Sequence, residues 1–261
     1  MTKQATKKIV ILIPCKNEAE AIADVVRSVP HTRAERLGFS IDVIVIDNNS
    51  TDATAEVART AGATVVYEKH PGKGRAMRTG FRSVGEDVDY VVMIDGDNTY
   101  HMSEVLRLVE PLESGFGDVI IGSRLAGKIH DDAMSFFNRV GNWGFSFLVR
   151  FLYRANVTDV LTGYFAWKRL ALVRLMPHIT AQGFGLEMDM VTKMARLGLS
   201  MYCVPIQYTA RSGVSNLHPV YDGFRILGVF LRNFFWHPAS SIGLFSHSRR
   251  GRLVPSIPSH L

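Results

Sequence analysis

The first 125 residues alternate short apolar runs with segments of helical periodicity, and this alternation constrains the fold more than any other feature of the chain. We expect the apolar runs to be buried strands, at Ile9–Pro14, Ile41–Asp47, Thr64–Tyr67, Asp89–Asp95 and Asp118–Gly122. Strands separated by helices of about 10–15 residues form βαβ units. The sequence therefore predicts an α/β fold, with a mostly parallel sheet flanked by helices.

The second half is less regular, and aromatic residues dominate two of its predicted helices. These helices, 132–154 and 220–236, carry arginines beside large apolar residues, which is typical of helices at a membrane interface. Core packing or a dimer interface would produce the same composition. The other expected elements are strands at Tyr164–Trp167 and Met201–Tyr208 and a helix at Leu186–Leu197.

The chain shows no internal repeat and no linker, so we expect one domain with extensions. The predicted segments are a basic N-terminal tail at 1–8, the α/β domain at 9–218, an amphipathic helix region at 219–245 and a basic tail at 246–261. The last segment is rich in proline and serine, and we expect it to be disordered.

Charge and cysteine content narrow the choice of partners and location. The formal net charge is +6, which favours an anionic partner such as nucleic acid, a phosphorylated small molecule or a membrane surface. Outside the C-terminal tail the cations are dispersed among acids, which argues against a nucleic-acid-binding protein. Two cysteines exclude a disulfide framework. No apolar run reaches the roughly 18 residues of a membrane span, and none resembles a signal peptide, so we expect a cytoplasmic protein.

Asp95-Gly96-Asp97 is the sharpest local motif, because it follows a predicted buried strand. Two carboxylates one residue apart can converge on one divalent cation, and the glycine between them lets the backbone turn. Mg²⁺ and Mn²⁺ prefer such oxygen ligands and are held by one or two carboxylates plus substrate phosphates. A solvated turn is the alternative, and the position of the motif at a strand end favours the metal.

Two further strand ends offer polar groups to a nucleotide. Asp47 can accept hydrogen bonds from a nucleobase or a ribose, although Asn49 beside it also suits a helix cap. The segment 71–75 is a glycine-rich basic loop that enters a helix and offers backbone N–H groups, Lys73 and Arg75 to a phosphate. It matches neither a P-loop nor a dinucleotide fingerprint, and a plain turn is the alternative.

In their order and spacing, these motifs resemble the inverting GT-A glycosyltransferases of family two, over roughly residues 8 to 230. The motifs of the first half that carry this resemblance are Pro14–Glu18, Asp47–Asp52, Gly72–Gly74, Asp95–Asp97 and Gly122–Arg124. Later motifs resemble the branch that makes polyprenyl-phosphate sugars, such as dolichol-phosphate mannose synthase. They are Asn138-Arg139, Thr158-Asp159, Thr162-Gly163, Gly185–Asp189 and Arg211–Asn216.

The resemblance implies a GT-A fold and a role for each matching residue. Asp95 and Asp97 would hold Mg²⁺ or Mn²⁺ on the donor diphosphate. Arg124, Arg139 and Arg211 would bind the diphosphate and the acceptor phosphate, because the guanidinium fork matches phosphate oxygens. Together with the basic loop, the residues expected to bind the nucleotide sugar are Pro14, Asn17, Glu18, Asp47, Asn49, Lys73, Gly74, Asp95 and Gly96.

The sequence departs from the family pattern at three positions. Lys16 stands where an aromatic residue is common before the Asn-Glu pair, and Asn48 stands where a second acid is usual after Asp47. Thr99 stands where a glutamine often follows the metal acids. The sequence also shows no pattern that matches the membrane helices of some family members.

The choice of acceptor decides whether a general base is needed. Transfer from a nucleotide sugar requires a stabilised leaving diphosphate, which cations provide electrostatically. A hydroxyl acceptor also requires a base, whereas a phosphate monoester, with a second pKa of about 6, is already an anionic nucleophile. The motifs hold more candidate cations than bases, which fits a phosphate acceptor. If a base is required, Asp159, Glu187 and Asp189 are the candidates.

The leading hypothesis is a metal-dependent inverting transferase that moves a sugar from a UDP- or GDP-sugar to polyprenyl or dolichyl phosphate, at the cytoplasmic face of a membrane. The nearest alternative is the same fold acting on a soluble hydroxyl acceptor. A sugar nucleotidyltransferase is a further alternative, but its glycine-rich loop would directly follow the first strand, where Pro14–Glu18 stands. The sequence leaves the sugar, the base and the oligomeric state open, and a homo-oligomer is compatible with it.

Overall fold

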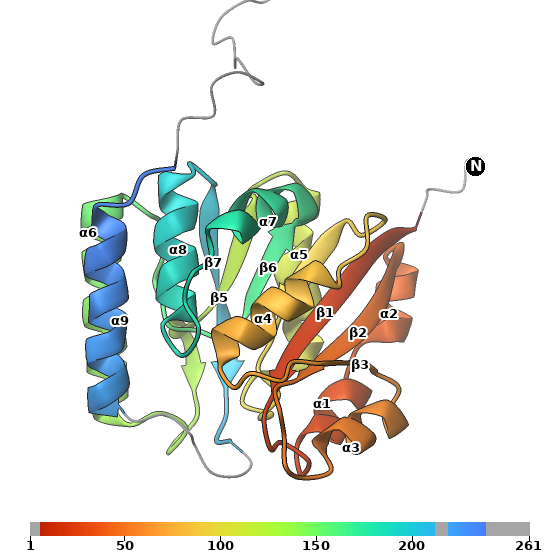
Figure 1. The fold of residues 1–261 in the computed structure, drawn as a ribbon. Coiled ribbons are helices and arrows are strands. Elements are labelled where there is room, and N and C mark those ends of the chain that lie inside the picture. Colours follow the sequence, from red (N-terminus) through yellow and green to blue (C-terminus); the bar gives the residue numbers. More distant parts are fainter. Residues whose placement is uncertain (1–5, 212–218, 239–261) are drawn as a thin grey trace, which may run out of the picture.

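The computed structural model describes residues 6–211 and 219–238, and its centre is a seven-stranded sheet (Figure 1). The strands are β1 (Lys7–Cys15), β2 (Phe39–Asp47), β3 (Thr64–Tyr67), β4 (Tyr90–Met93), β5 (Val119–Ile129), β6 (Phe165–Lys168) and β7 (Met201–Tyr208). Their order across the sheet is β3-β2-β1-β4-β6-β5-β7. β6 runs antiparallel to β4 and β5, and the other strand pairs are parallel. The predicted α/β fold with a mostly parallel sheet is confirmed.

Helices cover both faces because side chains of the central strands alternate between two apolar cores. Ile9, Ile11 and Ile13 of β1 point into one core, and Val10 and Leu12 point into the other. The first core is closed by α1 (Ile22–Arg27), α2 (His31–Arg36), α3 (Thr54–Thr60) and α5 (Val105–Glu113). The second is closed by α4 (Lys73–Arg82), α7 (Arg169–Leu175) and α8 (Leu186–Arg196).

Two long helices, α6 (Phe136–Tyr153) and α9 (Pro219–Phe234), pack against each other at the edge of the molecule beyond α8 (Figure 1). The ring of Tyr153 on α6 lies 5.7 Å from that of Phe230 on α9, and its hydroxyl donates to the Phe230 carbonyl at 3.1 Å. Val149 and Ile226 are buried against the rest of the fold. The two helices therefore form one layer on the second core.

The other faces of α6 and α9 expose large apolar side chains. Trp143, Phe147 and Phe151 follow one another at one-turn spacing, with successive ring centroids 5.9 and 6.4 Å apart, and each is more than half exposed. On α9, Tyr221 and Phe224 are also mostly exposed. Large exposed apolar patches on soluble proteins usually mark a binding surface.

Among the helices that the structure describes, none has the length and apolar character needed to cross a bilayer.

The differences from prediction concern short elements and element ends. α2 and α7 were not expected, since six and seven residues show too little periodicity to be detected. β5 reaches Ile129 instead of Gly122, because its extension pairs with β7 after a register shift between Ser123 and Lys128. β1 begins at Lys7, inside the segment expected to be a tail. The tail predicted at 246–261 lies outside the described residues.

Candidate active site

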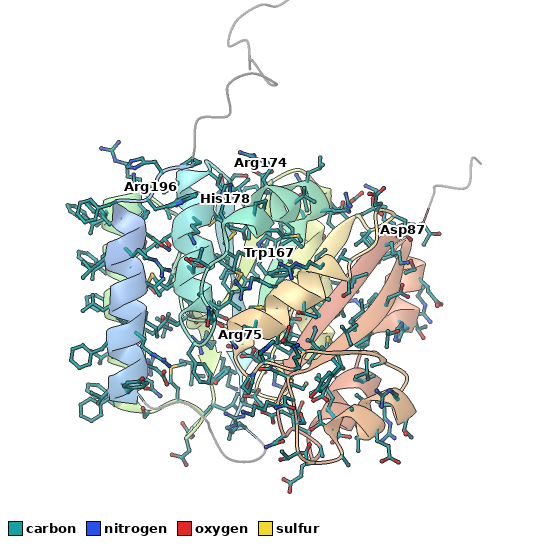
Figure 2. All side chains as sticks on the ribbon, viewed as in Figure 1. Arg75, Asp87, Trp167, Arg174, His178 and Arg196 are labelled. Atoms are coloured by element: carbon teal, nitrogen blue, oxygen red, sulfur yellow. The ribbon has the colours of Figure 1, made fainter. Side chains whose placement is uncertain are left out.

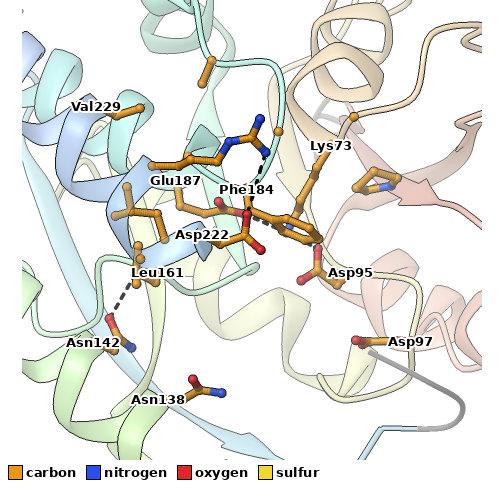
Figure 3. A pocket seen from close by; sticks show the side chains of 18 of the residues that line it. Lys73, Asp95, Asp97, Asn138, Asn142, Leu161, Phe184, Glu187, Asp222 and Val229 are labelled. Carbon is orange, nitrogen blue, oxygen red and sulfur yellow. Dashed lines mark hydrogen bonds and ion pairs between the residues drawn. The ribbon is translucent and has the colours of Figure 1, made fainter. Parts of the chain in front are cut away.

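A cavity of about 1500 Å³ opens at the carboxyl ends of the parallel strands (Figure 3). Such an edge is where mostly parallel sheets bind their ligands. Its walls come from the ends of β1 and β4, the start of α4, the loop 180–185, and the facing sides of α6 and α9. An ordinary small-molecule pocket measures about 300–1,000 Å³, so this cavity has room for more than one substrate.

The structure brings together one part of the predicted site and leaves the other outside the cavity. Predicted residues that line it are Pro14, Glu18, Lys73, Asp95, Gly96, Asp97, Arg124, Glu187 and Arg211. Predicted residues that do not line it are Asn17, Asp47, Asn49, Gly74, Arg139, Asp159 and Asp189.

Lys73 joins two acids that are far apart in the sequence. Its Nζ lies 2.6 Å from Asp95 Oδ1, at the end of β4, and 2.7 Å from Glu187 Oε1, in the first turn of α8 (Figure 3). Burial lowers the pKa of Lys73, but the two carboxylates outweigh this effect and raise it overall. Burial also raises the pKa of Asp95 to about 6, against the opposing charge of Lys73. A charged ammonium therefore lies beside a predicted metal ligand.

Arg211 forms a second cluster at the same end of the sheet. Its Nη2 lies 3.0 Å from Glu18 Oε1 and 3.5 Å from Asp97 Oδ2. Its Nε is buried and has no hydrogen-bond partner among the described residues. Burial raises the pKa of Glu18 to about 7, against the lowering effect of Arg211. Arg211 thus keeps a donor that an anionic ligand in the cavity can use.

The acids fit a divalent cation that is shared with a ligand. Within the described residues, no group of three or more His, Cys, Asp or Glu could hold a metal. Asp95 and Asp97 offer oxygen ligands and leave the remaining positions of Mg²⁺ or Mn²⁺ to phosphate oxygens and water. Thr99 does not join this pair directly, because its hydroxyl donates to Asp97 Oδ1 at 2.6 Å and orients that carboxylate.

Gly163 is required by the position of Asp95. A Cβ at residue 163 would lie 2.1 Å from Asp95 Oδ2, closer than any side chain can approach. Gly74 has a similar role in the basic loop, since its Cβ would lie 2.2 Å from the Ala181 carbonyl oxygen. Gly74 therefore allows α4 to pack against the loop 180–185, and it contributes no wall to the cavity.

Asp159 holds Arg124 instead of facing a substrate. Arg124 donates Nε and Nη2 to the two Asp159 oxygens, both at 2.8 Å, and Asn142 Nδ2 donates to Asp159 Oδ1 at 2.6 Å. Burial raises the pKa of Asp159, but the Arg124 charge and these hydrogen bonds outweigh it and hold the pKa below its usual value. Asp159 is fully buried, so the geometry argues against a general base at this position.

Asp189 is likewise fully buried, at the centre of a network that holds the loop 180–185. Its carboxylate accepts from the backbone N–H groups of Thr180 and Ala181 at 2.7 and 2.9 Å. It also accepts from Asn233 of α9 at 2.8 Å and pairs with Lys193 at 2.6 Å. Asp189 is therefore an anchor between α8, α9 and the loop, and of the three candidate bases only Glu187 faces the cavity.

The expectation for Arg139 is not supported, because the residue is exposed on α6 and lies off the cavity. Its neighbours Asn138 and Asn142 line the wall in its place (Figure 3). The side of α6 that carries Asn138 and Asn142 faces the cavity. Sequence spacing alone did not show which side of α6 this would be.

Asn17, Asp47 and Asn49 lie in hydrogen-bonded turns beside the cavity. Asn17 Oδ1 accepts from Thr51 N at 2.8 Å, Asp47 Oδ1 from Ser50 N at 3.1 Å, and Asn49 Oδ1 from the Tyr67 hydroxyl at 2.7 Å. Their part in nucleotide binding stays a prediction.

Sequence reasoning missed the contribution of α9. Asp222, Arg225 and Arg232 of this helix line the cavity, and Asp222 is buried near Glu187 (Figure 3). Arg225 and Arg232 are 61% and 55% exposed at their side chains, and their ion pairs are long, 3.9 Å to Asp222 and 3.5 Å to Asp189, so both keep donors for a ligand. The seven-residue spacing of the two arginines on one helix was the available signal.

Comparison with known proteins agrees with this geometry. The model of the family "Glycosyl transferase family 2" matches residues 10–175. Glycosyltransferase AglJ of Haloferax volcanii is 38% identical over 219 residues, which cover 82% of this chain and 68% of that protein. Dolichyl-phosphate hexose transferase of the same organism is 30% identical over 227 residues, which cover 87% of this chain and 93% of that protein.

A solved structure shares the fold. Glucosyl-3-phosphoglycerate synthase from Mycobacterium tuberculosis, in complex with Mn²⁺, UDP-glucose and phosphoglyceric acid, matches with a TM-score of 0.66 at 25% sequence identity. The match covers 92% of this chain and 84% of that one. It confirms the GT-A fold expected from the sequence.

Gly163→Ala should displace Asp95 and weaken metal-dependent nucleotide binding. We expect the affinity for UDP in the presence of Mn²⁺ to fall by about tenfold or more, as calorimetry would measure, because supporting residues commonly contribute this much to a metal site. Gly141→Ala is the matched control, since Gly141 lines the cavity but a Cβ there meets nothing within 4 Å. An unchanged affinity in Gly163→Ala would contradict the assignment of Asp95.

Lys73→Met should change the affinities for metal and for nucleotide in opposite directions. Without the ammonium beside Asp95, Mn²⁺ alone should bind several-fold more tightly, because a repelling charge is removed. The diphosphate of UDP loses a cation and should bind about tenfold more weakly. Electron paramagnetic resonance of free Mn²⁺ and calorimetry measure the two effects. Lys69→Met, at an exposed lysine off the cavity, is the control. A parallel loss of both affinities would show that Lys73 only supports the fold.

Glu18→Gln should gain stability relative to the wild type as the pH rises. The pKa of Glu18 is raised from 4.5 to about 7, so its neutral form is favoured in the fold. This contribution is complete below the unfolded pKa and is lost as the pH rises through the folded pKa. Thermal unfolding at about pH 5 and about pH 8, without metal or nucleotide, should show a growing advantage of Glu18→Gln. The exposed Glu20→Gln controls for the loss of one charge, and a difference independent of pH would refute the prediction.

Proposed function

This chain belongs to glycosyltransferase family 2, and on that premise we propose that it transfers a hexose from a nucleotide sugar to a polyprenyl phosphate, such as dolichyl phosphate, at a membrane surface. The observation that carries the proposal is that α6 and α9 form part of the cavity wall. The same two helices line it and expose aromatic residues on their outer faces.

The inner sides of α6 and α9 offer an apolar chain a route into the cavity. Phe137 and Phe145 of α6 line one wall, and Ile226 and Val229 of α9 line the other. On its outer face α6 carries the ladder of Trp143, Phe147 and Phe151. Exposed aromatic residues on helices that also carry arginines suit insertion at the boundary between headgroups and acyl chains. An acceptor held in a bilayer would then enter beside the surface that binds the bilayer.

Cations at the cavity favour a phosphate as the acceptor group. Arg225 and Arg232 lie on α9, on the side of the apolar wall, and both are accessible. Their guanidinium groups can bind phosphate oxygens through two parallel hydrogen bonds. Arg124 is less suited to this part, because Asp159 already occupies its Nε and Nη2.

The donor would lie at the opposite wall, where Asp95, Asp97, Lys73 and Arg211 meet. Mg²⁺ or Mn²⁺ bound by Asp95 and Asp97 would neutralise charge on the leaving diphosphate. Lys73 and the free Nε of Arg211 would bind the remaining phosphate oxygens. These groups are already in place before the reaction, which is how electrostatic stabilisation is most effective.

A phosphate acceptor also explains the state of the cavity acids. An oxygen of the acceptor phosphate attacks the anomeric carbon of the sugar, the bond to the diphosphate oxygen breaks, and the nucleoside diphosphate leaves with that electron pair. No base is needed because the attacking oxygen is already anionic. This fits Glu187, whose carboxylate is engaged by Lys73. A hydroxyl acceptor would instead require Glu187 or Asp222 to accept a proton.

A screen of donors against matched acceptors tests the proposal. Purified protein with Mn²⁺ and labelled UDP- or GDP-hexoses should form a lipid-linked product with polyprenyl phosphate in vesicles and none with the matching polyprenol. Asp97→Asn, folded as judged by circular dichroism, should form at least about a hundredfold less product. Product from a soluble hydroxyl acceptor, with none from polyprenyl phosphate, would refute the proposal.

A second arm tests the membrane surface. The double variant Phe147→Glu/Phe151→Glu should float less with vesicles and lose lipid-linked product, while its UDP affinity stays unchanged. Leu170→Glu is the matched control, because Leu170 is 75% exposed but lies on α7, away from the two helices. Equal flotation of both variants would contradict the assignment of α6 to the membrane-binding surface.

A further inference from the structure

The outer face of α4 carries three arginines, and two of them, Arg78 and Arg82, lie off the catalytic cavity. Arg75, Arg78 and Arg82 follow at spacings of three and four residues, so they lie along one side of the helix. The opposite side is buried, with Met77 and Phe81 in the core. Figure 2 shows Arg75 at the first turn of α4.

These arginines form one wall of a groove of about 420 Å³ that lies beside the catalytic cavity. The other walls come from the segment after β3 and from the loop before α8. The described residues that line it are Glu68, His70, Arg75, Arg78, Thr79, Arg82 and Gln182. All of them are polar, in contrast to the apolar side chains that α6 and α9 bring to the catalytic cavity.

Positive charge in the groove exceeds the negative charge that could balance it. Within the described part of the chain, Arg78 and Arg82 make no ion pair and no side-chain hydrogen bond. Arg75 donates Nη2 to the uncharged Gln182 Oε1 at 2.6 Å. Three guanidinium groups therefore face one carboxylate, that of Glu68.

Glu68 is already engaged by its own neighbours. Its Oε2 accepts from the Thr79 hydroxyl at 2.5 Å, and its Oε1 accepts from the His70 backbone N–H at 2.8 Å. These hydrogen bonds, that of Thr79 first, hold the pKa of Glu68 below its usual value. The carboxylate is thus held in place by neutral donors, and the arginines remain available to a ligand.

We propose that this groove is a second anion site, which binds a soluble ligand through a phosphate or diphosphate group. Guanidinium groups match phosphate oxygens through paired hydrogen bonds, and adjacent arginines on one helix face can bind one such group together. The absence of apolar side chains among the described lining residues favours a soluble ligand over a lipid headgroup. The site does not depend on the acceptor proposed above.

The groove is also connected to the catalytic cavity. Arg75 and Gln182 line both, and Gln182 belongs to the loop whose Ala181 carbonyl packs on Gly74, next to Lys73. An anion that draws Arg75 away from Gln182 acts on the loop leading to Glu187. Occupation of the groove is therefore expected to change the KM for the nucleotide sugar.

Calorimetric titration with inorganic pyrophosphate in EDTA tests the site on the full chain. The wild type should bind pyrophosphate, and Arg78→Gln/Arg82→Gln should bind it about tenfold or more weakly. Sugar transfer without pyrophosphate should be the same in both, because neither residue lines the catalytic cavity. Added pyrophosphate, with Mn²⁺ held in excess, also competes with the donor diphosphate in the catalytic cavity of both proteins, so the shift in the donor KM should be larger in the wild type than in the variant.

Arg33→Gln/Arg36→Gln on α2 is the charge-matched control and should bind pyrophosphate like the wild type. Equal weakening in both double variants would mean that only net charge matters and would overturn the proposal, as would full affinity in Arg78→Gln/Arg82→Gln or no binding by the wild type. Vesicles with phosphatidylglycerol distinguish the source of the phosphate. Loss of vesicle binding in Arg78→Gln/Arg82→Gln, without loss of pyrophosphate binding, would overturn the soluble ligand in favour of a lipid headgroup.

Discussion

The two ion pairs of Lys73 hold the candidate active site together. One ammonium, with 16% of its side chain exposed, connects the start of α4 to Asp95 at the end of β4 and to Glu187 in the first turn of α8. Removing one member of such a buried set leaves an uncompensated charge, which typically costs about 3–5 kcal/mol. This one side chain therefore links the central sheet to the two helices at this edge. The same cation sets the charge that a metal and a diphosphate would meet.

A second set of buried polar contacts fixes the far wall of the cavity. Asp189 ties the loop 180–185 to α9 through Thr180, Ala181 and Asn233. Glu187 lies two residues before Asp189 on α8. α9 is therefore connected through α8 to the acid beside Lys73. Asp95, Asp97 and Lys73 lie at the end of the sheet, and this network places α9 at the other wall of the same cavity. Asp159 has a comparable function, since it fixes the guanidinium of Arg124.

Much of the fold, and the acids and Lys73 at the end of the sheet, could be predicted from the sequence. The apolar runs of the strands are local features of the sequence, and so are Asp95 and Asp97 at the end of one of these runs. Their place in the fold follows from the strand that carries them. The roles of Asp159 and Asp189 could not be predicted. The sequence around an acid does not show whether its carboxylate faces a cavity or is buried against other polar groups. The orientation of Arg139 was missed for a related reason: a long helix with apolar residues on several sides does not reveal which side faces the cavity. The part of Asp222 and Arg232 was missed because the pattern of an aromatic helix with arginines does not show which side faces the cavity, although α9 directly follows the motif Arg211–Asn216.

The sequence by itself determined the alternation of strands and helices, the order of the motifs and the cations and acids available for the chemistry. These properties follow from periodicity and residue type, which act over a few positions along the chain. Tertiary structure decided which charges meet. It paired Lys73 with Asp95 and Glu187, and Arg124 with Asp159. It left Arg78 and Arg82 without partners among the described residues. Such pairings depend on distances between segments that are brought together by core packing, and no local pattern encodes them.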